Sequence, residues 1–207
     1  MANVLTLAPL QQAEALEVRQ VTEWHEAFSG FETANQYRVS SPHGEIFHVA
    51  EESEGFLAVL SRLFLQASRP FTLHISDGTQ IVATATRPWR FYFHEIEVEV
   101  GGRRLGSVRR RFSILRRRFD VLDAEGRAVL ELVGPLLKPW TFEAKRDGAD
   151  AGVITKQWSG LGKELLTDAD DFGVRFAMDL PDDHKMLLLC AVFLIDFLYF
   201  EKKSSRS

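Results

Sequence analysis

The stretch from His184 to Phe200 reads HKMLLLCAVFLIDFLYF, and it decides the fold more than any other part of the chain. Met186–Ile195 is apolar without interruption, and four more large side chains follow Asp196. A helix that is apolar on every side must be surrounded by protein core or by lipid. A bilayer span needs about 20 residues and tolerates ionisable groups poorly, whereas this run has about 15. We therefore predict a helix inside a closed β-barrel, in which Asp196 needs a partner such as arginine or a backbone N–H group, or a raised pKa.

The chain from Tyr37 to Trp158 supplies strands that such a barrel needs. Short runs alternate apolar and polar residues, as in Phe71, Leu73 and Ile75, and polar turns that contain glycine separate them. Glycine adopts positive φ at low cost, so these turns are typical of β-hairpins. The turn glycines are Gly44, Gly78, Gly101, Gly102, Gly126 and Gly148. Five hairpins in series predict an antiparallel barrel or sandwich.

The N-terminal region and one internal segment depart from this pattern. Residues 1–12 have the character of a flexible arm, and apolar residues at intervals of three to five predict a helix over Ala13–Phe28. We accordingly divide the chain into an arm, 1–22, and one domain, 23–203. The segment Gly55–Leu65 carries an apolar helical face, which indicates either a helix packed on the outside of the sheet or a surface that contacts a membrane.

Composition places the chain among globular proteins. It has 207 residues, of which 45% are hydrophobic, and 16 are Phe. This is enough to bury the core of one domain. A single cysteine indicates a reducing compartment, and the N-terminus lacks the basic and apolar regions of a signal peptide. We expect a cytoplasmic protein.

The charge distribution is strongly asymmetric. Eight arginines and no acidic residue lie between positions 103 and 118, although the net charge is −4. They are Arg103, Arg104, Arg109, Arg110, Arg111, Arg116, Arg117 and Arg118. A basic block on an acidic body indicates a polyanionic partner, either anionic lipid head groups or nucleic acid. The alternative is a solvated strand face that nearby carboxylates balance in the folded protein.

No motif for covalent catalysis is present. The sequence lacks G-x-S-x-G and both glycine-rich phosphate-binding patterns, and its six histidines show no spacing typical of metal ligands. Cys190 lies in the middle of the apolar run, where we expect an inert core residue. We predict that the protein is not an enzyme.

An acidic segment, 168–179, partly matches a calcium-binding loop. Asp168, Asp170 and Asp179 occupy ligand positions of the EF-hand pattern, and Asp171 adds a carboxylate, but Phe172 replaces a ligand. The residues from 174 to 178 also alternate like a strand. Ca²⁺ is therefore one possible ligand of these four aspartates, and a tight turn in which they cap backbone N–H groups is the other.

The segments Gly160–Phe176 and Cys190–Glu201 resemble the C-terminal signature of the phospholipid scramblase family. They read GLGKELLTDADDFGVRF and CAVFLIDFLYFE. Further similar segments run in family order and cover most of the chain: Gly30–Tyr37, Ser68–Leu73, Arg87–Trp89, Glu95–Val98 and Lys156–Gly160.

This resemblance implies a fold similar to tubby-like domains, a closed antiparallel barrel of about twelve strands around a central hydrophobic C-terminal helix. It also implies Ca²⁺-dependent, ATP-independent movement of phospholipids between leaflets, with a proposed Ca²⁺ segment that matches Asp168–Asp179. The palmitoylated cysteine cluster of animal members is absent, since Arg90–His94 contains no cysteine, and so is their proline-rich arm. We therefore expect a compact member of the family, peripheral at the inner face of the membrane and without lipid anchoring at those cysteines.

The alternative function is a soluble tubby-like module that binds anionic lipid head groups without moving lipid. Nucleic-acid binding rests on the same arginines, and a chain pI of about 5.9 argues mildly against it.

Overall fold

The structure, a computed structural model, describes residues 7–21, 35–52, 70–89, 94–138, 140–156 and 171–200. The segment Gly55–Leu65 lies outside these residues. The elements are α1 (Ala8–Gln11), β1 (Ala15–Val21), β2 (Gln36–Ser41), β3 (Gly44–Glu51), β4 (Phe71–Ser76), β5 (Ile81–Arg87), β6 (Glu95–Val100), β7 (Arg103–Arg111), β8 (Arg117–Asp123), β9 (Ala128–Gly134), β10 (Thr141–Arg146), β11 (Ala149–Lys156), β12 (Phe172–Phe176) and α3 (Asp182–Tyr199).

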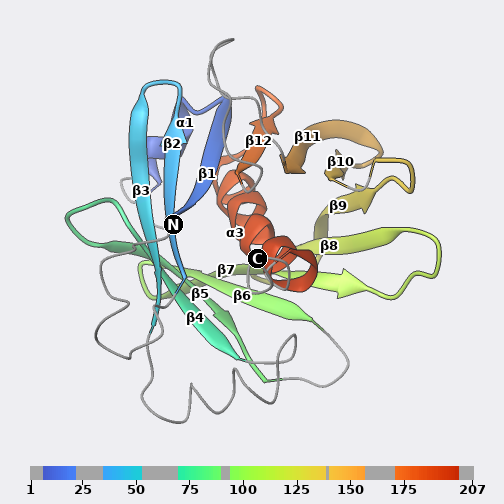
Figure 1. The fold of residues 1–207 in the computed structure, drawn as a ribbon, viewed down its shortest axis with the longest axis horizontal. Coiled ribbons are helices and arrows are strands. Elements are labelled where there is room, and N and C mark those ends of the chain that lie inside the picture. The colour runs from blue at the N-terminus through green and yellow to red at the C-terminus, as the bar shows by residue number, and fades with distance from the viewer. Residues whose placement is uncertain are drawn as a thin grey trace.

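The twelve strands form one closed antiparallel barrel. Each strand pairs with its neighbours in the sequence, and β1 closes the ring by pairing with both β12 and β2 (Figure 1). Alternating burial, such as that of Phe71, Leu73 and Ile75, turns one face of each strand inward. The predicted mainly β fold, a closed barrel around a C-terminal helix, is confirmed.

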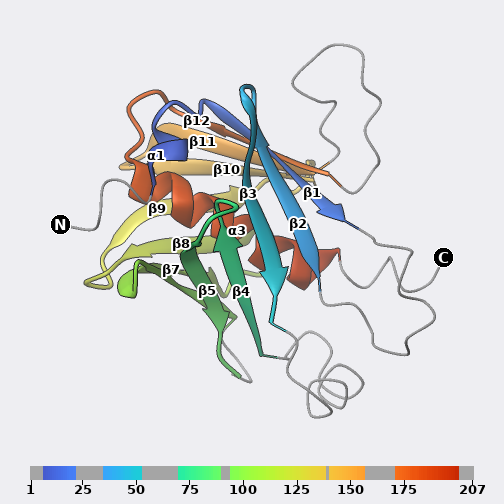
Figure 2. The same ribbon diagram turned by 90° about the vertical axis from the view of Figure 1, so that its left-hand side faces the viewer.

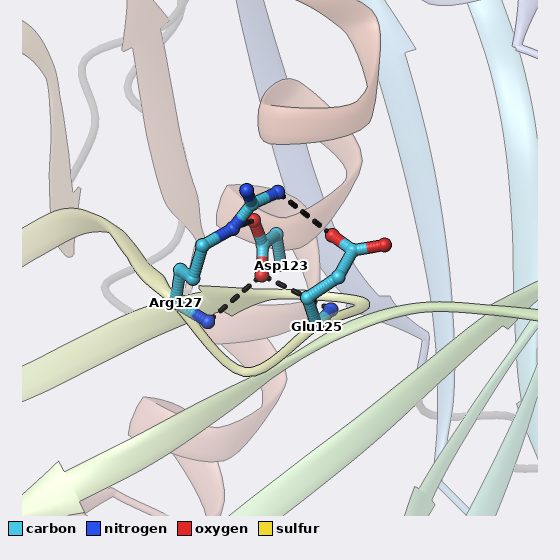
Figure 3. A network of polar contacts seen from close by, with 3 residues as sticks. All are labelled: Asp123, Glu125 and Arg127. Atoms are coloured by element: carbon cyan, nitrogen blue, oxygen red, sulfur yellow. Dashed lines mark hydrogen bonds and ion pairs between the residues drawn. The ribbon is translucent and has the colours of Figure 1, made fainter.

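The short turns at one end of the barrel, here called the turn end, contain the predicted glycines. All six have positive φ, for example +81° at Gly126. Beside Gly126, an Asp123 carboxylate oxygen accepts hydrogen bonds from the backbone N–H groups of Glu125 and Arg127 at 3.1 and 2.8 Å. The Arg127 guanidinium contacts the carboxylates of both Asp123 and Glu125, which holds the turn in a compact shape (Figure 3).

Helix α3 fills the barrel. Every residue from Lys185 to Phe197 is buried, and the helix runs along the inside of the strands (Figure 2). It begins at the turn end, where Lys185 Nζ donates a hydrogen bond to the carbonyl of Leu10 at 2.8 Å. Its last turn lies at the opposite end of the barrel, here called the exit end. The apolar run is therefore protein core, as its length and Asp196 predict.

Asp196 has the partners that its burial requires, although they differ from those expected. Tyr37 Oη donates a hydrogen bond to one carboxylate oxygen at 3.1 Å, and Lys156 Nζ lies 3.5 Å from the other. All three side chains are nearly inaccessible to solvent. The carboxylate is thus compensated by a lysine and a tyrosine that β11 and β2 contribute from the barrel wall.

The helix predicted over Ala13–Phe28 is wrong for Ala15–Val21, which forms β1. Leu16 and Val18 are both fully buried and two residues apart, so the inward face has the period of a strand. The apolar spacing of this short segment fits either element, and pairing with β12 and β2 decides between them. Part of the expected arm, 1–22, is therefore a strand of the barrel.

Candidate functional site

The arginine-rich segment forms the hairpin β7–β8, which separates its eight arginines by position. Arg103 and Arg104 begin β7 at the turn end, next to Gly102. The other six lie toward the exit end: Arg116 is in the connection 112–116, and the remaining five are on the strands next to it. A nine-residue strand spans roughly 30 Å, so the structure does not bring all eight together. The eight arginines are thus divided into six toward the exit end and a separate pair at the turn end.

Arginines on the outer face of the hairpin have acidic neighbours. Arg111 lies 3.8 Å from Asp120 and 3.7 Å from Glu131, and Arg118 lies 3.5 Å from the same glutamate. Exposed ion pairs of this kind contribute little to stability. For these two arginines, the alternative of a solvated face balanced by carboxylates describes the structure well.

Arg110 and Arg117 instead point inward, toward the last turn of α3. The guanidinium carbon of Arg110 is 5.7 Å from the Tyr199 ring centroid, and that of Arg117 is 5.4 Å from it and 4.6 Å from the Phe142 centroid. Burial lowers the pKa of Arg117, and Tyr199 opposes this shift. Cation–π contacts hold both charged groups at the rim of the barrel.

Two further cations, which the sequence did not place in a basic site, lie at the same end. Arg87 at the end of β5 stacks over the Phe197 ring at 4.5 Å, and Lys156 at the end of β11 stacks over Phe200 at 4.4 Å. In each strand, the cation takes the next inward-facing position after a series of apolar residues. A basic residue at such a position is the signal in the sequence that could have identified these two. Together with Arg110 and Arg117 they surround the C-terminal end of α3, whose helix dipole is negative.

His94 belongs to this cationic rim but is neutral. Its Nδ1 lies 2.6 Å from a guanidinium nitrogen of Arg87, which can only donate, so Nδ1 accepts. Burial, followed by the charges of Arg87 and Arg110, lowers the pKa of His94 to about 4. At neutral pH, the arginines therefore supply the positive charge here.

A hollow of about 360 Å³ lies beside the β7–β8 connection. Four arginines line it, Arg110, Arg111, Arg116 and Arg117, with Ser113 and the backbone of Gly134. Among the described residues, Arg110 and Arg116 have no carboxylate within salt-bridge distance. A cavity of this size with several guanidinium groups suits a phosphate-bearing head group, because arginine binds phosphate oxygens bidentately.

A larger hollow, of about 640 Å³, lies against β10, β11 and β12. Its lining has both signs of charge, and Lys145 and Asp150 in it form an ion pair with each other. It therefore lacks the uniform charge of the arginine-lined hollow.

The aspartates proposed as Ca²⁺ ligands are not all close together. Asp168 and Asp170 lie outside the described residues. Asp171 precedes β12 and Asp179 follows it by three residues, so the five strand residues between them alone span about 16 Å. Asp171 is 2% exposed and accepts from Arg19 Nε at 3.2 Å, and Asp179 pairs with Arg146. Asp179 is therefore not part of one site with Asp171.

In the described part of the chain, no three acidic, histidine or cysteine side chains are grouped as metal ligands would be. Cys190 is fully buried in α3, and burial raises the pKa of its thiol, which confirms the expected core residue. Across the described residues, no helix combines the length and the apolar character of a membrane span.

Comparison with known proteins identifies a family and several relatives. The family model described as Scramblase matches residues 1–202. The chain is 35% identical to mouse "Phospholipid scramblase 1" over 93% of its own length and 63% of that protein. It is 32% identical to human "Phospholipid scramblase 1" (95% and 66%) and 34% identical to bovine "Phospholipid scramblase 2" (93% and 70%).

The chain thus spans just under two thirds of the length of the mouse and human proteins named "Phospholipid scramblase 1". No solved structure matches it. The match of the family model over nearly the whole sequence, with relatives above 30% identity, shows that this chain belongs to the Scramblase family.

Proposed function

We propose that this chain binds the surface of anionic phospholipid bilayers through the exit end of its barrel and promotes ATP-independent movement of phospholipids between leaflets. The relatives are named as phospholipid scramblases, which supports the activity. The hollow lined by Arg110, Arg111, Arg116 and Arg117 is the observation that carries the membrane partner. The cytoplasmic leaflet is the surface that fits, because it carries the anionic lipids.

The charges on this end are enough for measurable attraction. An arginine close to an anionic membrane contributes about 1 kcal/mol, so Arg110, Arg116 and Arg117, which have no carboxylate partner among the described residues, contribute about 3 kcal/mol at low salt. Such attraction weakens as salt shortens the screening length. Binding should therefore depend both on the fraction of anionic lipid and on ionic strength.

Two matched variants test the surface. Arg110→Gln with Arg116→Gln removes two charges at the exit end, and Arg103→Gln with Arg104→Gln removes two at the turn end. In co-sedimentation with vesicles that contain phosphatidylserine, we expect the first variant to bind roughly tenfold or more weakly, from about 1 kcal/mol per charge. The second should bind like the wild type. Equal loss in both variants, or wild-type binding that ignores salt, contradicts the proposed surface.

Leaflet exchange tests the activity itself. Purified chain is added to liposomes that carry fluorescent phospholipid in both leaflets, and a membrane-impermeant reductant quenches only the outer one. Lipid movement is seen as fluorescence loss beyond the outer-leaflet share. No excess loss at high protein density contradicts the transport half of the proposal.

Calcium dependence is a separate part of this proposal. Asp168, Asp170 and Asp171 are the residues that would hold Ca²⁺, with Asp171 exchanging its ion pair with Arg19 for the metal, and the ion would add positive charge next to the anionic head groups. Calorimetric titration of the wild type with Ca²⁺ should show binding, which Asp168→Asn with Asp170→Asn abolishes and Asp179→Asn leaves intact. A wild type that releases no heat of binding, or a double variant that binds normally, contradicts this assignment.

A binding module without transport is the second candidate. The barrel interior is filled by α3, so lipid has no route through it, and this observation favours the module. Vesicle binding without leaflet exchange identifies it. If the chain binds nucleic acid instead of vesicles, with a steep dependence on salt, the arginines form a nucleic-acid site instead.

A further inference from the structure

The exit end of the barrel carries an unusual group of exposed apolar side chains. Among the described residues, eight large apolar side chains are exposed, and five of them lie on the two connections 112–116 and 135–138. These five, here called the apolar tips, are Phe112, Ile114, Leu115, Leu136 and Leu137, with exposed fractions of 88, 87, 73, 73 and 93%. Single exposed apolar residues are ordinary, but a contiguous group marks a surface that binds something.

The two connections are neighbours in space. Arg117 pairs with Gly134 in the register of β8 and β9, which places the start of one connection beside the other. Ile114, Leu115 and Leu136 all border the same arginine-lined hollow. The apolar tips therefore form one surface.

Arginines flank the tips along the chain. Within the connection 112–116, Phe112, Ile114 and Leu115 lie between Arg111 and Arg116, so these apolar side chains extend from the hairpin beyond its last strand residues. Cation–π contacts fix Arg110 and Arg117 farther back, at the barrel rim. The apolar tips are therefore outermost, and the guanidinium groups lie between them and the barrel. In a bilayer the phosphates lie above the acyl chains, so tips that reach the acyl chains would place the guanidinium groups at the level of the phosphates.

We propose that the apolar tips insert into the acyl boundary of an anionic phospholipid bilayer, with the arginines of the hollow at the level of the phosphates. This inference rests on the proposed membrane binding and adds the orientation: the C-terminal end of α3 faces the bilayer, and the turn end faces away. Trp89, which is 49% exposed after the last residue of β5, lies at the same end and suits the interface, where tryptophan is enriched.

Site-specific fluorescence tests the orientation. Single substitutions Phe112→Cys, Leu137→Cys and Met178→Cys introduce exposed thiols, while the native Cys190 is fully buried and serves as the unlabelled background. Each is labelled with the environment-sensitive dye NBD. Met178 is 93% exposed and follows β12 at the turn end, so it is the matched control.

On addition of vesicles that contain phosphatidylserine, NBD at 112 and 137 should shift to the blue and brighten at least twofold, and NBD at 178 should not change. Vesicle binding without a change at 112 and 137, or with a change at 178, overturns the orientation and leaves membrane binding intact. Absence of vesicle binding overturns the proposed function itself.

A second measurement does not depend on labels. Phe112→Ser with Leu137→Ser removes two exposed side chains, so the melting temperature and circular dichroism should match those of the wild type. Partition to anionic vesicles should fall at least tenfold, whereas Met178→Ser should leave it unchanged. Unchanged partition of the double variant contradicts insertion.

The other possible occupant of this surface is a second copy of the chain. Sedimentation velocity in the absence of lipid separates the two: if the wild type is a dimer that Phe112→Ser with Leu137→Ser converts to a monomer, the tips form a protein interface, and insertion is wrong.

Discussion

At the scale of single residues, the buried ion pair Lys156–Asp196 should be sensitive to substitution. Asp196 lies on α3 and is 5% exposed, and Lys156 on β11 is 8% exposed. Removal of one member of a buried ion pair leaves the other charge uncompensated, which costs about 3–5 kcal/mol. We expect Asp196→Ala to lower the free energy of unfolding by this amount in urea. Asp196→Asn, whose amide still accepts from Tyr37, should lose less. A loss of less than about 1 kcal/mol for Asp196→Ala contradicts the pairing.

His94 gives a prediction on pH. Its pKa in the folded protein, about 4, is below the ordinary 6.5, so the unfolded chain binds the proton more tightly. The folded state, in which His94 is neutral, therefore has its full stability above pH 6.5. It loses stability as the pH falls toward 4, because protonation favours the unfolded chain. Urea unfolding at pH 7 and pH 5 should show this loss in the wild type and a smaller one in His94→Gln. Because His94 is half-buried, we predict the direction of the difference only. An identical pH dependence in both proteins contradicts the assignment.

At the scale of elements, β7 depends on a close approach at Gly106. A Cβ atom there would stand 2.1 Å from the carbonyl oxygen of Leu122 on β8 and 3.2 Å from Leu187 on α3. The backbone oxygen cannot move without breaking the β7–β8 ladder. We expect Gly106→Ala to lower the free energy of unfolding by about 1–3 kcal/mol or more. Alanine substituted at Gly134, where a Cβ would meet side chains, is the milder comparison. If the two variants are equally stable, the close approach is wrong.

At the scale of the whole molecule, β1 completes the barrel, because its pairs with β12 and β2 leave no strand edge in the ring. Deletion of residues 1–21 removes this strand, exposes two edges and uncovers the core around Leu16. We expect the truncated chain to lose cooperative unfolding in circular dichroism and to aggregate in size-exclusion chromatography. A monomeric truncated chain with a wild-type melting transition shows instead that the arm, 1–22, is dispensable for the fold.

The sequence by itself determined the hairpins and the buried helix. The period-two alternation and the turn glycines predicted the hairpins, and the length of the apolar run with Asp196 predicted a helix in the core, because these features act over a few residues. Tertiary structure alone decided that Ala15–Val21 is a strand, since its pairs are remote in sequence. It also decided that Arg87 and Lys156 join Arg110 and Arg117 around the end of α3, and that Asp171 and Asp179 are apart. Which charges meet at one end of a barrel depends on strand length and closure, and neither can be read from local spacing.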